Sequence, residues 1–415
     1  MEECSSAFGD DTFRRLRLNS PTTGRWFPAL RDLTWCITKY NFPYADLFFT
    51  PHLEKVSILI SSTWLNSEIP RDILPAVTST ISAIPGSALQ HLLISMSHRR
   101  VPWEHFKESL SSVVLRCGPS LTEFISPIPL SDAAVDHLIH LPNLDIWDIE
   151  YPPPSYSASP LPSTFPPLTD LSLGENAHEW LSLFGRLEGG APPVPGAGPL
   201  SRLKESLETL TIQSLSGSMT DLSFVSPTQM FRNLGHLDVD VFCREDVEGQ
   251  CIFKLDNDNV TKLVMALPQL VFLLLGHPCF ENTCATTVAC LLSISVYCLK
   301  LAYLEIHFNT TNILEDFKNI SEDPKFRELR SLPKCPLLFV DVFATPLTLD
   351  EPGYKAVADG MRDIFPSLRR CEGLRDNVWG EVSKNLRRVG TSSECNLRPP
   401  PPPLCLTHPR IAGET

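Results

Sequence analysis

The sequence has no excess of basic residues and no long hydrophobic run. Its 35 lysines and arginines stand against 48 aspartates and glutamates, a formal net charge of -13. A negatively charged protein does not attract the negatively charged phosphate backbone, so we expect no nucleic-acid partner. The first 20 residues have acidic side chains where a secretory signal needs basic ones. The longest apolar stretch, from Cys290 to Ile306, is interrupted by Lys300 and is shorter than the roughly 20 residues that span a bilayer. We therefore expect a cytoplasmic or nuclear protein without a membrane partner.

The sequence also lacks the common motifs of catalysis and cofactor binding. It contains no phosphate-cradling glycine loop, no Gly-x-Ser-x-Gly turn and no His-Glu-x-x-His helix. Its 13 cysteines are odd in number and scattered, which favours reduced thiols over a disulfide framework. The cluster Cys279, Cys284, Cys290 and Cys298 does not form the two close pairs of a structural zinc site, and we interpret it as buried thiols. We expect no enzyme activity, no metal and no cofactor.

One segment resembles a calcium loop without completing it. The run "DNDNV" begins at Asp256, but Thr261 stands where the loop needs glycine and Leu267 where it needs glutamate. An aspartate followed by an amphipathic run is also typical of a helix start. We therefore predict that Asp256 caps a helix and binds no calcium.

What the sequence does contain is a repeated pattern, Leu-x-x-Leu-x-Leu, with aliphatic or aromatic substitutes allowed. Repetition at intervals of some tens of residues is typical of solenoids. In two copies the pattern extends three residues further to an asparagine, Asn176 and Asn309, whose side chain can bond the backbone where a strand turns away. The copies are "LRDLTW" at Leu30, "LEKVSI" at Leu53, "LQHLLI" at Leu89, a weaker "LTEFIS" at Leu121, "LDIWDI" at Leu144, "LTDLSL" at Leu168, "LETLTI" at Leu207, "LGHLDV" at Leu234, "LVFLLL" at Leu270 and "LAYLEI" at Leu301.

Segments of helical spacing lie between several copies. Strand, helix and strand in a recurrent register predict parallel strands joined by crossovers of one hand. The predicted fold is therefore α/β, a leucine-rich repeat solenoid, or horseshoe, with parallel strands and irregular helical crossovers. The predicted helical segments start at Val101, Ser131, Asp256 and Thr283, and two more, "DEPGYKAVADGMRDIF" and "DNVWGEVSKNLRRV", follow a further strand in "CPLLFVDVFATPL".

On these repeats, from about Leu30 to Val389, the chain resembles the leucine-rich repeat portion of F-box proteins, particularly the irregular set of mushroom-forming (basidiomycete) fungi. The repeat starts are about 23 to 39 residues apart, where regular repeats run about 20 to 29. The resemblance implies a substrate receptor of an SCF-type cullin ubiquitin ligase, with an F-box of about 40 residues docking on the ligase adaptor. Only about 29 residues precede the first repeat here, without the leading Leu-Pro pair, so we expect the F-box to be absent.

The predicted organisation has three parts. Residues 1–29 form a partly disordered extension, residues 30–389 the solenoid with a C-terminal cap, and residues 390–415 a disordered proline-rich tail. Two proline-rich stretches, residues 151–167 and 187–199, cannot be regular structure and are predicted to be protruding loops. Such loops are common binding elements, although flexible filler is the alternative.

Strand side chains alternate, so the residues between the leucines, Tyr303 among them, should point to the concave surface and be solvated. Across the middle and C-terminal repeats this surface is acidic, which favours a basic protein partner; the alternative is that the carboxylates only keep the solenoid soluble. Phe272 and Leu274 should also face this side, as an interaction site or as a strand covered by a loop. The candidate partner-binding residues are Asp148, Glu150, Asp170, His236, Asp238, Asp240, Glu305 and His307.

These features together predict a protein recognition module. The first hypothesis is a substrate receptor resembling those of cullin ligases, which binds its target on the concave strand face and contacts the ligase adaptor. The alternative is a stand-alone leucine-rich repeat scaffold or inhibitor with no link to ubiquitin. In either case we expect catalysis to belong to a partner.

Overall fold

The computed structural model describes the greater part of the repeat region. The described residues are 10–19, 27–37, 42–60, 74–96, 103–150, 164–174, 176–189, 199–215, 228–242, 255–276, 285–342, 347–373 and 378–388. They fall into two compact units, the first with residues up to 171 and 199–203, the second with residues 172–189 and 204–388.

The first unit alternates strands with helical segments. Each strand from β1 to β5 pairs in parallel with the next one along the chain. The elements are α1 (Asp10–Asn19), β1 (Asp32–Ile37), η1 (Phe42–Phe48), β2 (Lys55–Ile60), α2 (Leu74–Ser82), β3 (His91–Met96), η3 (Trp103–Phe106), α3 (Lys107–Val114), β4 (Glu123–Ser126), α4 (Asp132–Ile139) and β5 (Ile146–Ile149), with β6 (Asp170–Leu173) and α6 (Ser201–Ser206) at its limits.

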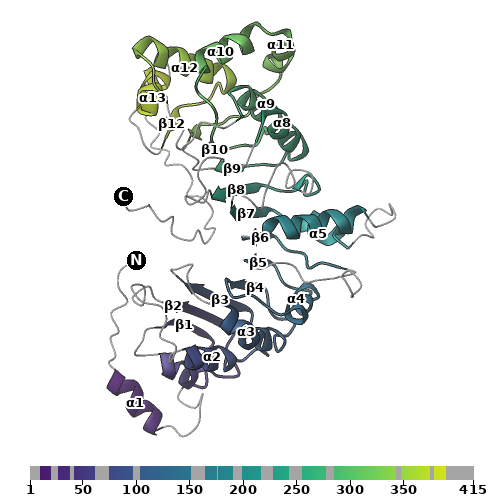
Figure 1. Ribbon diagram of the computed structural model, residues 1–415, viewed down its shortest axis with the longest axis vertical. Helices are drawn as coiled ribbons and strands as arrows, with labels where there is room; N and C mark the ends of the chain where they lie inside the picture. Colours follow the sequence, from purple (N-terminus) through teal and green to yellow (C-terminus); the bar gives the residue numbers. More distant parts are fainter. Residues whose placement is uncertain are drawn as a thin grey trace. The chain divides into compact units, whose positions relative to one another are not determined.

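The second unit continues the pattern from β7 to β12, again with each strand parallel to the next. Figure 1 shows α8 and α9 side by side along one flank of strands β8 to β10. The elements are α5 (Ala177–Gly189), β7 (Thr209–Leu215), β8 (His236–Phe242), α8 (Asn257–Ala266), β9 (Phe272–Gly276), α9 (Ala289–Tyr297), β10 (Tyr303–Ile306), α10 (Ile313–Glu322), α11 (Pro324–Ser331), β11 (Phe339–Asp341), α12 (Glu351–Ile364), β12 (Arg370–Glu372) and α13 (Val378–Arg388).

The leucine pattern explains this arrangement. In the repeat that starts at Leu270, all three pattern residues are fully or almost fully buried, and the same holds for its counterparts at Leu89 and Leu234. Just before each of strands β1 to β5 and β7 to β9, one backbone carbonyl accepts two amides of the next repeat. The Glu54 carbonyl, for example, accepts from Gln90 N at 2.7 Å and His91 N at 3.0 Å. Parallel strands in chain order with helical crossovers are the architecture of a leucine-rich repeat solenoid, and this prediction is confirmed.

The predicted helices also form, and a side chain caps the first turn of α4 and of α8. The Ser131 hydroxyl accepts from Ala134 N at 3.4 Å at the start of α4, and an Asp256 carboxylate oxygen accepts from Asn259 N at 2.8 Å at the start of α8. Asp256 is therefore a helix cap, as we predicted from the amphipathic run that follows it. Its cap bond satisfies an amide that has no partner within the helix.

Replacing this cap should have a measurable cost. We expect Asp256→Ala to lower the free energy of unfolding by about 1 kcal/mol, because one amide of the first turn loses its acceptor. Asp256→Ser, which keeps an acceptor, should recover most of the loss in the same urea titration. Equal stability of the alanine variant and the parent would show that the cap contributes nothing.

Parts of the predicted loops are ordered instead. Phe165, within the predicted loop 151–167, is 1% exposed, and its amide donates to the Pro199 carbonyl at 3.0 Å. Residues 164–167 therefore do not protrude. Burial of the Phe165 ring stabilises this conformation by more than the missing amide donors of the prolines destabilise it. Helix α5 runs to Gly189, so the first three residues of the predicted loop 187–199 are helical. The rest of both loops, apart from Pro199, lies outside the described residues, as does the tail 390–415.

The N-terminal extension contributes one helix to the first unit. Phe13 of α1 packs its ring against Trp35 at 5.6 Å, Tyr44 at 5.6 Å and Phe48 at 6.3 Å between centroids. Arg17 of the same helix pairs with Asp46 at 2.9 Å. The helix thereby covers the aromatic end of the repeat stack, as terminal caps do in solenoids. Among the described residues, no helix is long and apolar enough to cross a membrane.

Candidate functional site

The first two outward positions of strands β8 to β12 form two rows of side chains in the second unit. Outward positions are those between the buried leucine positions, on the side that the sequence predicts to be concave. Each row therefore has one side chain on each strand. The "aromatic row" comprises His236, Phe272, Tyr303, Phe339 and Arg370. The "acidic row", two residues further along each strand, comprises Asp238, Leu274, Glu305, Asp341 and Glu372.

Each ring of the aromatic row contacts the next. The centroids of His236 and Phe272 are 5.4 Å apart, those of Phe272 and Tyr303 6.1 Å, and those of Tyr303 and Phe339 5.4 Å. The first and third pairs are stacked, with interplanar angles of 22° and 24°, and the middle pair is tilted by 33°. Phe272, Tyr303 and Phe339 are each partly exposed. The row therefore presents aromatic ring surface to solvent across its strands.

A guanidinium closes the row at β12. The Arg370 Cζ atom lies 5.8 Å from the Phe339 ring centroid, within the distance of a cation–π contact. The same guanidinium pairs with the Glu372 carboxylate of the acidic row. Arg370 thus joins the two rows at one end by stacking on a ring and binding a carboxylate.

The acidic row differs from the solvated face that the sequence predicted. Asp238, Asp341 and Glu372 are partly exposed, but Glu305 is 2% exposed. The Tyr303 hydroxyl lies 3.2 Å from Glu305 Oε2 and donates to it. Glu305 is therefore a buried, hydrogen-bonded carboxylate, and the expectation that it is solvated is wrong. Leu274 of β9 and Asp341 of β11 flank it on the neighbouring strands, which alternation along one strand cannot reveal.

His236 is also buried, contrary to the solvated position that the sequence predicted. It is 6% exposed, and neither ring nitrogen has a hydrogen-bond partner among the described residues. Burial lowers the pKa of His236 to about 4, because the charged ring would lose its hydration. Burial likewise lowers the pKa of His307, which is partly exposed, as is Asp240. His236 is therefore a neutral member of the aromatic stack at pH 7.

The remaining candidate residues belong to the first unit or its limit. Asp148 and Glu150 are partly exposed in β5 and just after it. Asp170 lies near Asp145 and Glu123, and its pKa rises to about 6 through burial first and through the charges of those two carboxylates second. Glu123 in turn pairs with His91, whose Nδ1 atom is 2.8 Å from Glu123 Oε2. The candidate residues are thus divided between the units, with His236, Asp238, Asp240, Glu305 and His307 in the second.

Sequence reasoning missed the last two strands' contribution to the face. It noted Phe272, Leu274 and Tyr303 as outward residues, and all three are partly exposed. It did not place Phe339, Asp341, Arg370 or Glu372 there. The signal was present in "LLFVDV" at Leu337 and "LRRCEG" at Leu368, where valine, cysteine and glycine stand at pattern positions. An alignment of these segments with the ten clearer copies places Phe339, Asp341, Arg370 and Glu372 at outward positions.

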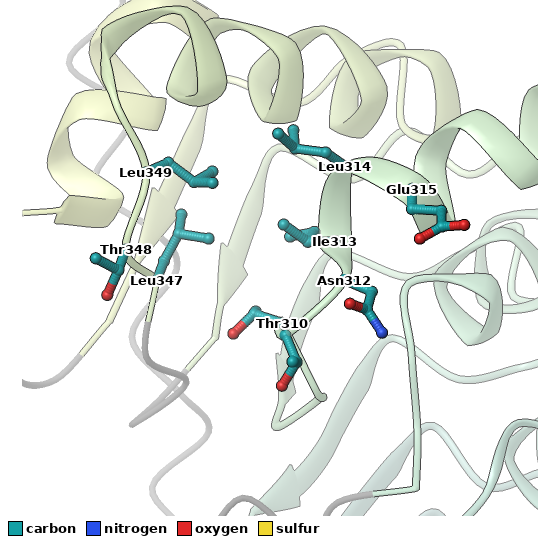
Figure 2. A pocket seen from close by; sticks show the side chains of 9 residues that line it. Thr310, Asn312, Ile313, Leu314, Glu315, Leu347, Thr348 and Leu349 are labelled. Atoms are coloured by element: carbon teal, nitrogen blue, oxygen red, sulfur yellow. The ribbon is translucent and has the colours of Figure 1, made fainter.

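A separate hollow of about 240 Å³ lies at the start of α10. Figure 2 shows Leu347 and Leu349 on one side of it and Ile313 and Leu314 of α10 on the other. Its volume is below the range of about 300–1,000 Å³ that is usual for small-molecule sites. Its lining carries one ionisable side chain, Glu315, so we do not assign chemistry to it.

The cysteines of the described residues are not arranged for metal binding or reactivity. No group of three or more potential metal ligands occurs in the described part of the chain. Burial raises the pKa of Cys117 and Cys298 to about 12 and that of Cys335 to about 11, which keeps these thiols protonated. Cys279 and Cys284 of the predicted thiol cluster lie outside the described residues, whereas Cys290 and Cys298 are buried.

Comparison with known proteins adds a structural likeness only. No family model matches the chain, and no curated protein is a significant match. Among solved structures, the chain is similar to one in the "Crystal structure of Rad7 and Elc1 complex in yeast", with 12% sequence identity and a TM-score of 0.37. The match covers 89% of this chain and 83% of that one. The solenoid assignment rests on the register and burial of this chain's own strands.

Proposed function

We propose that this chain is a protein recognition module, a substrate receptor resembling those of SCF-type cullin ubiquitin ligases, which binds its target on the outward strand face. The observation that carries the proposal is the pair of rows on β8 to β12, where partly exposed rings stand beside carboxylates. Aromatic side chains are enriched at protein interfaces, and carboxylates select a basic partner. Catalysis belongs to the partner ligase, in the cytoplasm or nucleus.

A second candidate is a stand-alone leucine-rich repeat scaffold or inhibitor. The packing of α1 favours it, because Phe13 and Arg17 use this helix to cover the repeat stack. A helix committed to capping is not available to dock on a ligase adaptor. Both candidates share the strand face and differ only in whether cullin and its adaptor accompany the chain.

Charge reversal on the face tests recognition. We expect the double variant Asp238→Lys and Asp240→Lys to lose partner recovery at least tenfold when the tagged chain is purified from its own cells in moderate salt. The two carboxylates attract a basic surface, and two lysines repel it. Mass spectrometry of the co-purified proteins gives the measurement. A matched control, Glu322→Lys and Glu328→Lys, makes the same charge change on exposed positions of α10 and α11 and should leave recovery unchanged.

The same purification separates the two candidates. Cullin and its adaptor among the recovered proteins would support the receptor, and other proteins without them would support the stand-alone scaffold. Asp238→Asn with Asp240→Asn removes the charges with little change of shape, so it covers the case in which the lysines unfold the strand. Undiminished recovery with both the folded lysine variant and the asparagine variant would contradict the acidic-face proposal.

A further inference from the structure

We propose that the aromatic row and the acidic row together bind a proline-rich segment of a partner protein that carries arginine and lies in polyproline II conformation. The inference rests on the proposed function, since it names the partner class for the same face. Proline packs on aromatic rings, and arginine binds both rings and carboxylates. The two rows supply rings at one position of a strand and carboxylates two residues further along. Aromatic-lined grooves are a common binding mode for proline-rich segments.

The spacing of the rows favours this backbone over others. Neighbouring strands are about 4.8 Å apart, so every second rung of a row recurs at about 9.6 Å. A polyproline II helix rises about 3.1 Å per residue with three residues per turn, which gives a repeat of about 9.3 Å. An α-helix, with a pitch of about 5.4 Å, falls out of step with the 4.8 Å rungs within a few turns. A polyproline II segment laid across β8 to β12 therefore meets the rows in register, one turn for two strands.

Arg370 shows how an arginine binds here. Its guanidinium lies over the Phe339 ring at 5.8 Å and pairs with the Glu372 carboxylate, so one side chain uses both rows at once. On β10 and β11, Tyr303 and Asp341 offer a partly exposed ring and carboxylate in the same two rows. Arginine suits such a site better than lysine, because its planar group stacks on rings and binds carboxylates in a fork.

Charge complementarity favours a basic segment over a neutral one. The ten described positions of the two rows carry four carboxylates and one guanidinium. Glu305 is buried and Glu372 pairs with Arg370, whereas Asp238 and Asp341 are partly exposed. The whole chain has a formal net charge of -13. Proline lowers the entropy cost of binding, because the free segment already holds its extended conformation. A segment that repeats proline, proline and arginine would direct each arginine to the same side of its helix, toward the acidic row.

The test measures binding of a defined peptide to the purified full-length chain. The probe is fluorescein-labelled (Pro-Pro-Arg)4, followed by fluorescence anisotropy in moderate salt. The first control, (Gly-Ser-Arg)4, has the same charge without the polyproline backbone, and the second, (Pro-Pro-Glu)4, has the backbone with the opposite charge. We expect the probe to bind at least tenfold more tightly than either control.

Two variants locate the binding on the rows. Tyr303→Leu removes one ring, and Asp341→Asn removes one charge, and each should weaken the probe at least fivefold. Tyr297→Leu, a tyrosine at the end of α9 and away from both rows, is the matched control and should change nothing. A thermal melt of each variant confirms that it is folded. Equal binding of the probe to folded Tyr303→Leu, Asp341→Asn and the parent would overturn the proposal.

The chain's own run from Arg398 to Pro403 is a competing occupant, because it has the same chemistry. A full-length variant with serine at positions 399–403 separates the two. Binding of the probe to the parent chain, with the dependence on Tyr303, supports a partner segment. Binding to the serine variant alone assigns the rows to the tail and overturns the partner. Binding to neither also overturns the inference, while partner recovery lost on charge reversal would leave the proposed function standing.

Discussion

Replacement of Gly360 by alanine is expected to destabilise the second unit by about 2 kcal/mol, although alanine is the better helix former. Gly360 lies in α12, and a Cβ atom there would come 2.5 Å from Cδ1 and 2.6 Å from Cγ of Phe317 in α10. Packing one carbon too many into a close contact usually costs about 1–3 kcal/mol. That cost exceeds the gain of up to about 1 kcal/mol from replacing glycine inside a helix. The measurement is urea unfolding followed by circular dichroism.

The chain supplies matched controls for this prediction. Gly185 is an exposed glycine in α5, and apart from its chain neighbours and its own helix backbone no atom of the described residues lies within 4 Å of the position that a Cβ atom would take there. Gly185→Ala should therefore raise the free energy of unfolding by up to about 1 kcal/mol. In a Phe317→Ala background, Gly360→Ala should no longer destabilise, because the ring that it meets is gone. A loss of stability in that background equal to the loss in the parent would contradict the proposed contact.

Replacement of His236 by phenylalanine should make the protein more tolerant of acid. Burial lowers the pKa of His236 from 6.5 to about 4. As the pH falls below 6.5, the unfolded chain therefore binds a proton at this residue that the folded chain does not bind. The parent therefore loses stability progressively from pH 6.5 down to about pH 4. At pH 5 the free energy of unfolding is lower by about 2 kcal/mol for this reason. The phenylalanine variant does not show this loss, because phenylalanine does not titrate.

We expect the stability difference between His236→Phe and the parent to be about 2 kcal/mol larger at pH 5 than at pH 7.5, measured by urea unfolding at both values. At pH 7.5 the variant should be as stable as the parent or slightly more stable, because it also removes two buried ring nitrogens that have no partner among the described residues. The other titrating groups, His307 and Asp170 among them, are common to both proteins and cancel in the difference. A difference that does not change with pH would show that His236 titrates normally in the folded chain.

Local patterns were enough to predict most of the architecture. A leucine at each inward position of a short strand has one stable environment, the core, so the pattern at Leu234 or Leu270 predicted both a strand and its buried face. Helices with apolar residues at helical spacing and a polar cap, such as α4 and α8, were predicted for the same reason. Strand β12 was missed because Cys371 occupies a leucine position, and α10 and α11 were missed because their stability depends on neighbours more than on capping.

The candidate site was predicted only in part. Alternation along a strand identified Asp238, Asp240 and Tyr303 as outward residues, and they are partly exposed. It could not identify Glu305 and His236 as buried, because exposure depends on side chains of the adjacent strands, which belong to other repeats of the sequence. Long-range packing of this kind overrides the simple rule that polar side chains on an outward face are solvated.

The sequence alone determined that the strands of this protein are parallel and that leucines fill their inward positions, because each repeat encodes its own strand and core positions. Only the tertiary structure decided that His236, Phe272, Tyr303 and Phe339 form one row of contacting rings, with Arg370 at its end. The physical reason is register: rings at corresponding positions of separate repeats come within stacking distance only when the strands align side by side. The face that we propose for partner binding is a property of that alignment.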